Sequence, residues 1–422
     1  MLRKAITRTL FTGFDLLQGG GLSRYYQQVS YFNASKAGNK SDDYVIHEPL
    51  KAYLQNWGFG NILECLPLMT KQDVISWTEK VAPQDIYSWA YTGGSYGEPL
   101  RVPYSKQRNL VRTATFKFFN EQAGYHIGDS FALIRAKDKS ALLKFLRNET
   151  IIIPHNAFWR NIVQIHRQLV RNKVKVLIGY PSVLYELATF YRVNPLLLAE
   201  LSVESMISAS EMLEDEKRQQ IFEVFQCPFV DRYSNEEVGL IAQQRQFGGE
   251  YFVNRFGVVV EVLDPDTLQA TSVGEVGRVV VSDYLNDLVP MIRYDTGDLA
   301  VVSEYDQFGL KSISKIIGRV AETLYDTSGN PISSLALGPC IYKPFSRAAY
   351  SYQFQLAQVA DKAYELRIKA GEVDVKLSVL DEIKSALGNI LGETMQLAIS
   401  FVADIPAQPS GKRPVYKNEM TS

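Results

Sequence analysis

The sequence predicts an α/β protein with a large N-terminal domain of parallel βαβ sheets, a β-rich barrel-like subdomain, and a small α+β C-terminal domain. Short branched apolar runs alternate with helical repeats from Ser105 to Tyr233, a pattern typical of parallel strands covered by helices. Between Glu250 and Tyr284 two branched runs are separated by proline and glycine, which favours an antiparallel, barrel-like sheet. After Arg319 strand-like runs flank an amphipathic helix, which indicates a further compact unit.

The individual elements follow from the spacing of apolar residues. Residues 1 to about 90 are aromatic-rich with a helical pattern, and Thr70 with Asp73 forms a candidate capping box for a helix over 74–81. In the alternating region the spacing predicts strands at 131–134, 151–153, 174–178 and 206–209. Helices are predicted around 110–118, 141–146, 158–169, 182–191 and 214–225. Beyond them we expect strands at 258–263, 276–281, 364–368 and 397–402, and a helix at 379–391.

Composition describes an ordinary globular chain without a special partner class. At 422 residues, with 46% hydrophobic and 22% charged residues, the chain exceeds the usual size of a single core. A net charge of −1 gives no electrostatic footprint for nucleic acid. Cys65, Cys227 and Cys340 are isolated, so we expect buried thiols rather than disulfides or zinc ligands. No apolar run reaches the roughly 18 residues of a membrane span, and we expect a cytoplasmic protein.

Three polar segments follow strands of the predicted parallel sheet. They are residues 179–182, 208–211 and 233–237. In open α/β sheets, ligands bind beyond the carboxyl ends of the strands. We therefore expect these three segments to lie together at one edge of the sheet.

The segment YTGGSYGEPL, residues 91–100, is the most glycine-dense candidate for a binding loop. It contains neither a Walker motif nor GxGxxG. Its glycines would expose backbone N–H groups and Thr92 and Ser95 would add hydroxyl donors, so the loop could fold around phosphate oxygens. An ordinary surface hairpin is an equal alternative on these residues alone.

The segment PMIRYDTGDL, residues 290–299, gathers an arginine, a hydroxyl and two carboxylates within six positions. We expect a sharp turn over 295–298 at the end of a strand, with Gly297 at positive φ. The plain alternative is an aspartate-rich turn without function. An aspartic protease is excluded because its carboxylate dyad needs two aspartates that share a proton, and the chain has a single DTG.

Taken together, these segments resemble the adenylate-forming superfamily of acyl-CoA ligases, adenylation domains and luciferases. The closest branch is the phenylacetate–CoA ligase-like group, including CapK-type proteins of capsular polysaccharide biosynthesis. The family loop TSG[ST]TGxP is matched by Thr92, Gly94, Ser95, Gly97 and Pro99. Gly93 and Tyr96 depart from that pattern.

Four further motifs of the family occur in the expected order over the rest of the chain. The motif YGx[ST]E is matched by Tyr233 and Glu237, although Ser234 and Glu236 replace its other defined positions. The remaining matches are Tyr294, Thr296, Gly297 and Asp298 for YxTGD, Gly318-Arg319 for the GR before the hinge, and Gly411-Lys412 for the terminal GK loop. The resemblance thus implies an N-terminal domain over 1–318 and a small mobile C-terminal domain over 319–422.

The resemblance also implies a role for each matched residue. ATP would activate a small-molecule carboxylic acid as an acyl-adenylate, with loss of pyrophosphate. Lys412 and Arg319 would be catalytic, and Glu237 would bind Mg²⁺. Tyr180 and Ser182 would line the acyl pocket. The ATP and AMP contacts would come from Thr92, Gly94, Ser95, Gly97, Ser210, Glu211, Tyr233, Asp298 and Arg319.

The acyl acceptor is open at this point. CoA is the leading acceptor, with Ala321 or Glu322 at the hinge about which the C-terminal domain turns. An enzyme that transfers the acyl group to an amine or hydroxyl in surface-polysaccharide synthesis is an alternative. A non-catalytic nucleotide-binding relative is a third hypothesis. Neither the acid nor the oligomeric state follows from the sequence.

Overall fold

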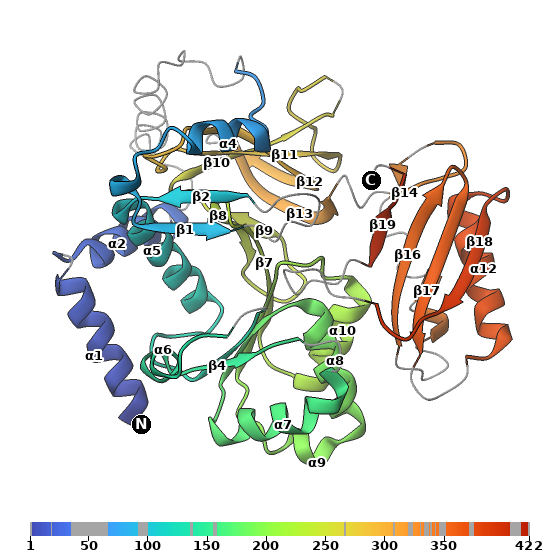
Figure 1. The fold of residues 1–422 in the computed structure, drawn as a ribbon, viewed down its shortest axis with the longest axis horizontal. Coiled ribbons are helices and arrows are strands. Elements are labelled where there is room, and N and C mark those ends of the chain that lie inside the picture. Colours follow the sequence, from blue (N-terminus) through green and yellow to red (C-terminus); the bar gives the residue numbers. More distant parts are fainter. Residues whose placement is uncertain are drawn as a thin grey trace.

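The computed structural model describes the chain apart from residues 1, 18, 35–65, 92–99, 136–137, 155–157, 266, 307–308, 320–323, 330, 333–336, 338–339, 342, 346–351, 371–374, 406–414 and 421–422. An eleven-stranded sheet forms the centre of the fold (Figure 1). One half of that sheet is parallel and the other half is antiparallel. This arrangement confirms the predicted α/β class.

The parallel half contains the strands predicted between residues 131 and 235. In spatial order they are β4 (Glu149–Ile152), β3 (Phe131–Ile134), β5 (Val176–Gly179), β6 (Ser205–Ala209) and β7 (Phe229–Asn235). The predicted helices are also present, as α5 (Lys106–Gln122), α6 (Ala141–Arg147), α7 (Phe158–Arg171), α8 (Pro181–Val193) and α10 (Asp215–Phe225), with a short α9 (Pro195–Leu198). Leu177, Leu184 and Ile221 are fully buried between these strands and helices, because the branched runs supply one apolar layer and the helical faces supply the other.

The antiparallel half continues outward from β7 without a break in the sheet. Its strands are β8 (Gly239–Gln244), β9 (Tyr251–Val253), β13 (Gly309–Arg319), β12 (Met291–Asp306), β11 (Val276–Asp283) and β10 (Val258–Leu263). The runs predicted at 258–263 and 276–281 are β10 and β11. Val279, Val281, Met291 and Ile313 lie on a shared buried face, which closes the barrel-like core that the sequence predicted.

The prediction of a turn over residues 295–298 is wrong, because these residues lie inside β12. Val280 on β11 pairs with Asp295, but Arg278 pairs with Leu299. Three residues of β12 therefore stand opposite Val279 alone, which is a β-bulge. Gly297 does have a positive φ, of 73°, as expected. The bulge keeps the strand continuous while it moves the side chain of Asp298 out of the regular alternation.

The N-terminal residues form helices and a small hairpin. The helices are α1 (Leu2–Leu17), α2 (Gly21–Ala34) and α4 (Lys71–Thr78), followed by the 3₁₀ turn η2 (Pro83–Asp85). The predicted capping box is present at α4, where the Thr70 hydroxyl accepts from the Asp73 backbone N–H. β1 (Ser88–Tyr91) and β2 (Arg101–Tyr104) form an antiparallel pair that brackets residues 92–99.

The C-terminal elements form a lobe of their own, coloured orange to red in Figure 1. Its four-stranded sheet has the order β18 (Gln396–Phe401), β17 (Ala363–Ala370), β16 (Tyr352–Ala360) and β19 (Tyr416–Asn418). The predicted helix is α12 (Leu377–Leu391), and a small pair, β14 (Leu324–Tyr325) and β15 (Pro331–Ile332), precedes the sheet. Met212 of the larger part packs against the core of this lobe, and the Tyr416 hydroxyl donates to Glu214 at 3.3 Å.

Two of the expectations drawn from composition can be compared with the described residues. Cys227 and Cys340 are buried free thiols, as expected, whereas Cys65 lies outside the described residues. Among the helices that the structure describes, none is both long and apolar enough to cross a membrane.

Candidate functional site

The three polar segments predicted to meet at one edge of the parallel sheet do so. β5, β6 and β7 pair in parallel, with Gly179 opposite Ser208 and Ser208 opposite Asp231. Residues 179–182, 208–211 and 233–237 therefore leave the sheet at the same end. This end of the sheet gathers hydroxyl and carboxylate groups from three consecutive strands, β5, β6 and β7.

Two tyrosines join this edge to the bulged strand β12. The Tyr233 hydroxyl, on β7, donates to Asp298 Oδ2 at 2.8 Å. In the opposite direction, the Tyr294 hydroxyl, on β12, donates to Glu237 Oε1 at 3.1 Å. β7 and β12 are not neighbours in the sheet, so these side chains meet because the antiparallel half curls back toward β7. The residues of two separate sequence motifs are thereby brought into one cluster.

The bulge fixes the position of Asp298 through its own hydrogen bonds. Thr296 Oγ1 donates to the Val279 carbonyl at 2.9 Å and accepts from the Asp298 N–H at 3.1 Å. Asp295 accepts from the Gly297 N–H at 2.9 Å and pairs with Arg278. A carboxylate held in this way has a defined direction before any ligand binds.

The backbone of Arg319 lies beside the backbone of Asp298. Arg319 ends β13 and pairs directly with Asp298 of β12. The GR motif and the TGD motif, about twenty positions apart in the sequence, are thus neighbours in the fold.

These strands complete a fold that solved enzymes share. No family model matches the chain, and no curated protein matches its sequence. The fold is that of acyl-CoA ligases. A structure of 2-hydroxyisobutyryl-CoA ligase in the postadenylation state, in complex with R3-HIB-AMP, superposes with a TM-score of 0.65 at 14% identity, over 95% of this chain and 89% of that one.

Two further structures agree in fold over a smaller share. ATP-bound MatB from Rhodopseudomonas palustris gives a TM-score of 0.56 at 16% identity, over 79% of this chain and 67% of MatB. The anthranilate CoA ligase AuaEII in complex with anthranoyl-AMP gives 0.55 at 15% identity, over 78% of this chain and 65% of AuaEII. Similarity at this level of identity establishes the shared architecture.

Within this acyl-CoA ligase fold, the start of α8 forms a second polar group beside the cluster. Pro181 is the first residue of the helix, and the next N–H, of Ser182, donates to Glu211 Oε2 at 3.1 Å. The carboxylate of Glu211 thus caps a helix N-terminus, where negative charge is favoured. Burial, and then the charge of Glu211, raises the pKa of Tyr180 to about 12, so the phenol stays neutral. The Ser182 hydroxyl is buried and makes no hydrogen bond to the described part of the chain.

Ser210 has a backbone conformation that L-residues rarely adopt. Its φ is 75°, and its side chain is exposed between the end of β6 and Glu211. A non-glycine residue in this region of φ costs of order 1–3 kcal/mol, and such residues cluster at ligand-binding sites. The contact of Ser210 with a ligand stays a prediction.

Several predicted site residues fall outside what the structure describes. Thr92, Gly94, Ser95 and Gly97 lie in residues 92–99, and Lys412 lies in 406–414. Ala321 and Glu322, the candidate hinge positions, fall in 320–323. The strands around residues 92–99 are placed, with Tyr91 paired to Arg101. The roles of these residues stay predictions.

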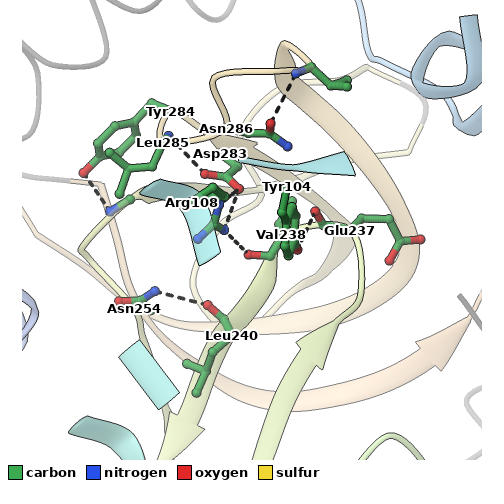
Figure 2. Close-up of polar contacts among 12 residues, drawn as sticks. Tyr104, Arg108, Glu237, Val238, Leu240, Asn254, Asp283, Tyr284, Leu285 and Asn286 are labelled. Carbon is green, nitrogen blue, oxygen red and sulfur yellow. Dashed lines mark hydrogen bonds and ion pairs between the residues drawn. The ribbon is translucent and has the colours of Figure 1, made fainter. Parts of the chain in front are cut away.

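The turn that carries Glu237 is held by residues that the sequence did not single out. Tyr104 donates its hydroxyl to the carbonyl oxygens of Glu236 and Glu237, at 2.9 and 3.3 Å. Arg108 donates Nη2 to the Val238 carbonyl at 2.6 Å and Nε to Asp283 Oδ2 at 2.8 Å. Figure 2 shows Tyr104 and Arg108 pointing at the backbone of the turn, while the Glu237 carboxylate points away from them.

Asp231 lies beneath the cluster, two residues before Tyr233. The hydroxyls of Ser208 and Tyr251 donate to its two carboxylate oxygens, and its backbone N–H donates to Gln244 Oε1 at 3.0 Å. Burial raises the pKa of Asp231, and the two hydroxyl bonds oppose that rise. Asp231 thereby ties β6 to β7 just below the ligand edge.

Asp231→Asn should remove a pH-dependent loss of stability. A pKa raised above 3.8 in the folded state means that the folded protein holds the proton more tightly than the unfolded chain. That contribution favours folding below the ordinary pKa and is lost as the pH rises through the raised value. Relative to the wild type, the unfolding temperature of Asp231→Asn should therefore increase as the pH rises above 3.8. The control is Asp381→Asn, which changes an exposed carboxylate on α12. Parallel curves of unfolding temperature against pH for Asp231→Asn and the wild type would contradict the raised pKa of Asp231.

Proposed function

We propose that the chain is an ATP-dependent ligase that activates a carboxylic acid as an acyl-adenylate, releases pyrophosphate, and passes the acyl group to the thiol of CoA. The observation that carries the proposal is the reciprocal pairing of Tyr233 with Asp298 and of Tyr294 with Glu237. It assembles two motifs of adenylate-forming enzymes on a fold that solved acyl-CoA ligases share. We further propose the phenylacetate–CoA ligase-like branch, including CapK-type proteins, on the sequence resemblance.

The nucleotide would bind along the edge formed by β6, β7 and β12. Asp298 is half-buried, and its carboxylate accepts hydrogen bonds when ionised, which suits the two ribose hydroxyls. Arg319, paired in backbone with Asp298, would supply a planar set of donors to phosphate or ribose. Ser210, Glu211 and Tyr233 would frame the adenine.

The chemistry at the α-phosphate is charge development without covalent participation by the protein. Attack by the carboxylate places negative charge on the phosphoryl oxygens as pyrophosphate leaves, so the chain's task is to position groups and stabilise that charge. Thr92, Gly94, Ser95 and Gly97 would hold the outer phosphates through N–H and hydroxyl groups. Lys412 would bring a cation to the α-phosphate when the C-terminal domain, 319–422, closes on the N-terminal domain, 1–318.

Magnesium fits the acidic residues of this site in number and kind. Mg²⁺ in nucleotide-dependent enzymes is held by one or two carboxylates together with substrate phosphates. Glu237 is a buried carboxylate with one oxygen on Tyr294. Over the described residues no group of three or more candidate ligands occurs, so the nucleotide phosphates would have to supply the remaining ligands. When bound, Mg²⁺ would neutralise charge on the phosphates.

The acyl group would lie near the start of α8. Tyr180 is largely buried and neutral, and the Ser182 hydroxyl is buried without a partner in the described chain. An unpartnered buried hydroxyl costs free energy unless a ligand group satisfies it. A carboxylic acid with a polar substituent near Ser182 would satisfy it.

Isotope exchange between pyrophosphate and ATP across a panel of carboxylic acids tests the first step. Exchange that depends on one class of acid is the expected result. Mass spectrometry of the products formed with CoA then tests the second step. An acyl amide or ester in place of the thioester would identify the alternative, transfer to an amine or hydroxyl in surface-polysaccharide synthesis. Absence of exchange with every acid, together with retained ATP binding, would indicate the non-catalytic relative.

Glu237→Gln should raise the Mg²⁺ concentration needed for half-maximal exchange by at least roughly tenfold, because a neutral amide is a poorer ligand for a hard cation. Glu236→Gln is the matched control, since this adjacent carboxylate pairs with Arg112 near the surface. Measuring exchange rates over a Mg²⁺ titration separates the two variants. If Glu237→Gln titrates like the control, the metal lies elsewhere.

A further inference from the structure

The turn between β7 and β8 has three consecutive carbonyl groups held from outside the turn. Tyr104 binds the carbonyls of Glu236 and Glu237, and Arg108 binds that of Val238. Inside the turn, the Val238 N–H donates to Asn235 Oδ1 at 2.9 Å. Fixing three successive peptide units leaves the Cα–Cβ direction of Glu237 little freedom.

Arg108 is itself fixed by a buried ion pair. Its guanidinium is 2.6 Å from Asp283 Oδ2, and the two side chains are 5% and 0% exposed. Asp283 accepts in addition from the Leu285 N–H at 3.1 Å. The planar guanidinium thus reaches the Asp283 carboxylate at the end of β11 and the Val238 carbonyl in the turn at once, which the single nitrogen of a lysine does not reproduce.

Tyr104 and Arg108 are also rigidly tied to the hairpin of β1 and β2. Tyr104 is the last residue of β2, and Ser105 caps α5 by accepting from the Arg108 N–H at 3.1 Å. The position of the turn that carries Glu237 is therefore fixed relative to the β1–β2 hairpin, as well as to β7 and β8. Figure 2 shows the resulting arrangement, with Arg108 between Asp283 and the Val238 carbonyl.

We infer that Tyr104 and Arg108, with Asp283, are positioning residues that hold the 236–238 turn so that the Glu237 carboxylate meets Tyr294 and a metal–nucleotide complex. The inference rests on the proposed function, because it takes Glu237 as a metal ligand. It assigns to the buried Arg108–Asp283 pair a role in orienting the Glu237 carboxylate, in addition to its place in the core. Outer residues that orient a metal ligand typically change metal affinity by 10–100-fold when they are replaced.

The test compares Tyr104→Phe and Arg108→Lys with the control Arg112→Lys. Arg112 lies one helical turn further along α5 and binds the side chain of Glu236 at 3.2 Å instead of the backbone of the turn. Each protein is titrated with Mn²⁺ in the presence of a non-hydrolysable ATP analogue, with free Mn²⁺ followed by electron paramagnetic resonance. Hydrogen exchange of the peptide that spans 235–239 is measured without metal, and thermal unfolding monitors the fold.

For both test variants the Mn²⁺ concentration at half-saturation should be at least about 10-fold that of the wild type. The backbone amides of residues 235–239 should exchange faster. Arg112→Lys should match the wild type in both measurements. Folded test variants with faster exchange but wild-type Mn²⁺ affinity would overturn the positioning role and leave the proposed function standing. Wild-type protein that binds no Mn²⁺–nucleotide complex would overturn the proposed function and this role with it, while the metal-free exchange data would still show whether the turn is anchored.

Discussion

Asp298→Ala should weaken ATP binding by about 10²–10⁴-fold. Each of the two ribose hydroxyls would lose a hydrogen bond to a charged acceptor, worth roughly 1.5–3 kcal/mol. Every 1.4 kcal/mol is a factor of about ten in the dissociation constant, so two such bonds give the stated range. Titration calorimetry of ATP with the wild type and the variant measures the change directly.

The adjacent carboxylate offers a control in the same bulge. Asp295 pairs with Arg278 and accepts from the Gly297 N–H, and Asp295→Asn keeps the second of these contacts. We expect Asp295→Asn to bind ATP much as the wild type does. An unchanged dissociation constant in Asp298→Ala would remove the ribose assignment, and equal losses in both variants would point to collapse of the bulge.

Lys412→Ala should slow adenylation by ~10²–10³-fold, the usual effect of losing one preorganised charge stabiliser. The prediction comes from the sequence, because Lys412 lies outside the described residues. ATP affinity should change little, because the open form would bind ATP without Lys412. Transfer from preformed acyl-adenylate should survive, because the proposed rotation of the C-terminal domain would carry Lys412 away from the site. Exchange assays and single-turnover transfer assays measure the two steps separately.

A lysine in the described part of the C-terminal lobe provides the comparison. Lys417 lies on β19 and pairs with Glu419 at 2.8 Å, so Lys417→Ala should leave both steps near wild type. Equal loss of both steps in Lys412→Ala would assign Lys412 to folding or general phosphate binding. Wild-type rates for both steps in Lys412→Ala would indicate that Lys412 belongs to a basic tail without a catalytic role.

The parallel half of the fold could be predicted because its signals are local. Each strand there is a short apolar run and each helix has an apolar face, so the carboxyl ends of β5, β6 and β7 follow from the order of elements. The bulge in β12 could not be predicted, because a positive φ at Gly297 suits a turn and a bulge equally. Only the pairing with β11 decides between them.

The anchors of the Glu237 turn were missed for a related reason. Arg108 sits on a helix whose sequence gives no sign that an arginine will be buried. Its partner Asp283 is 175 residues away, and charged residues are almost never fully buried unless they are paired. Such a pair becomes visible only when the sheet brings α5 and β11 together.

The separation of these partners along the chain also determines when the site can exist. Tyr233 and Asp298 are 65 residues apart, Tyr294 and Glu237 are 57 apart, and Tyr104 lies 132 residues before Glu236. No stretch of chain shorter than Tyr104–Asp298 contains all of these groups. Contacts of this span close large loops and are slow to form. A nascent chain that has not yet emerged past β12, or one cleaved before it, therefore lacks Tyr294 and Asp298, so ligand binding at this site requires the chain through β12.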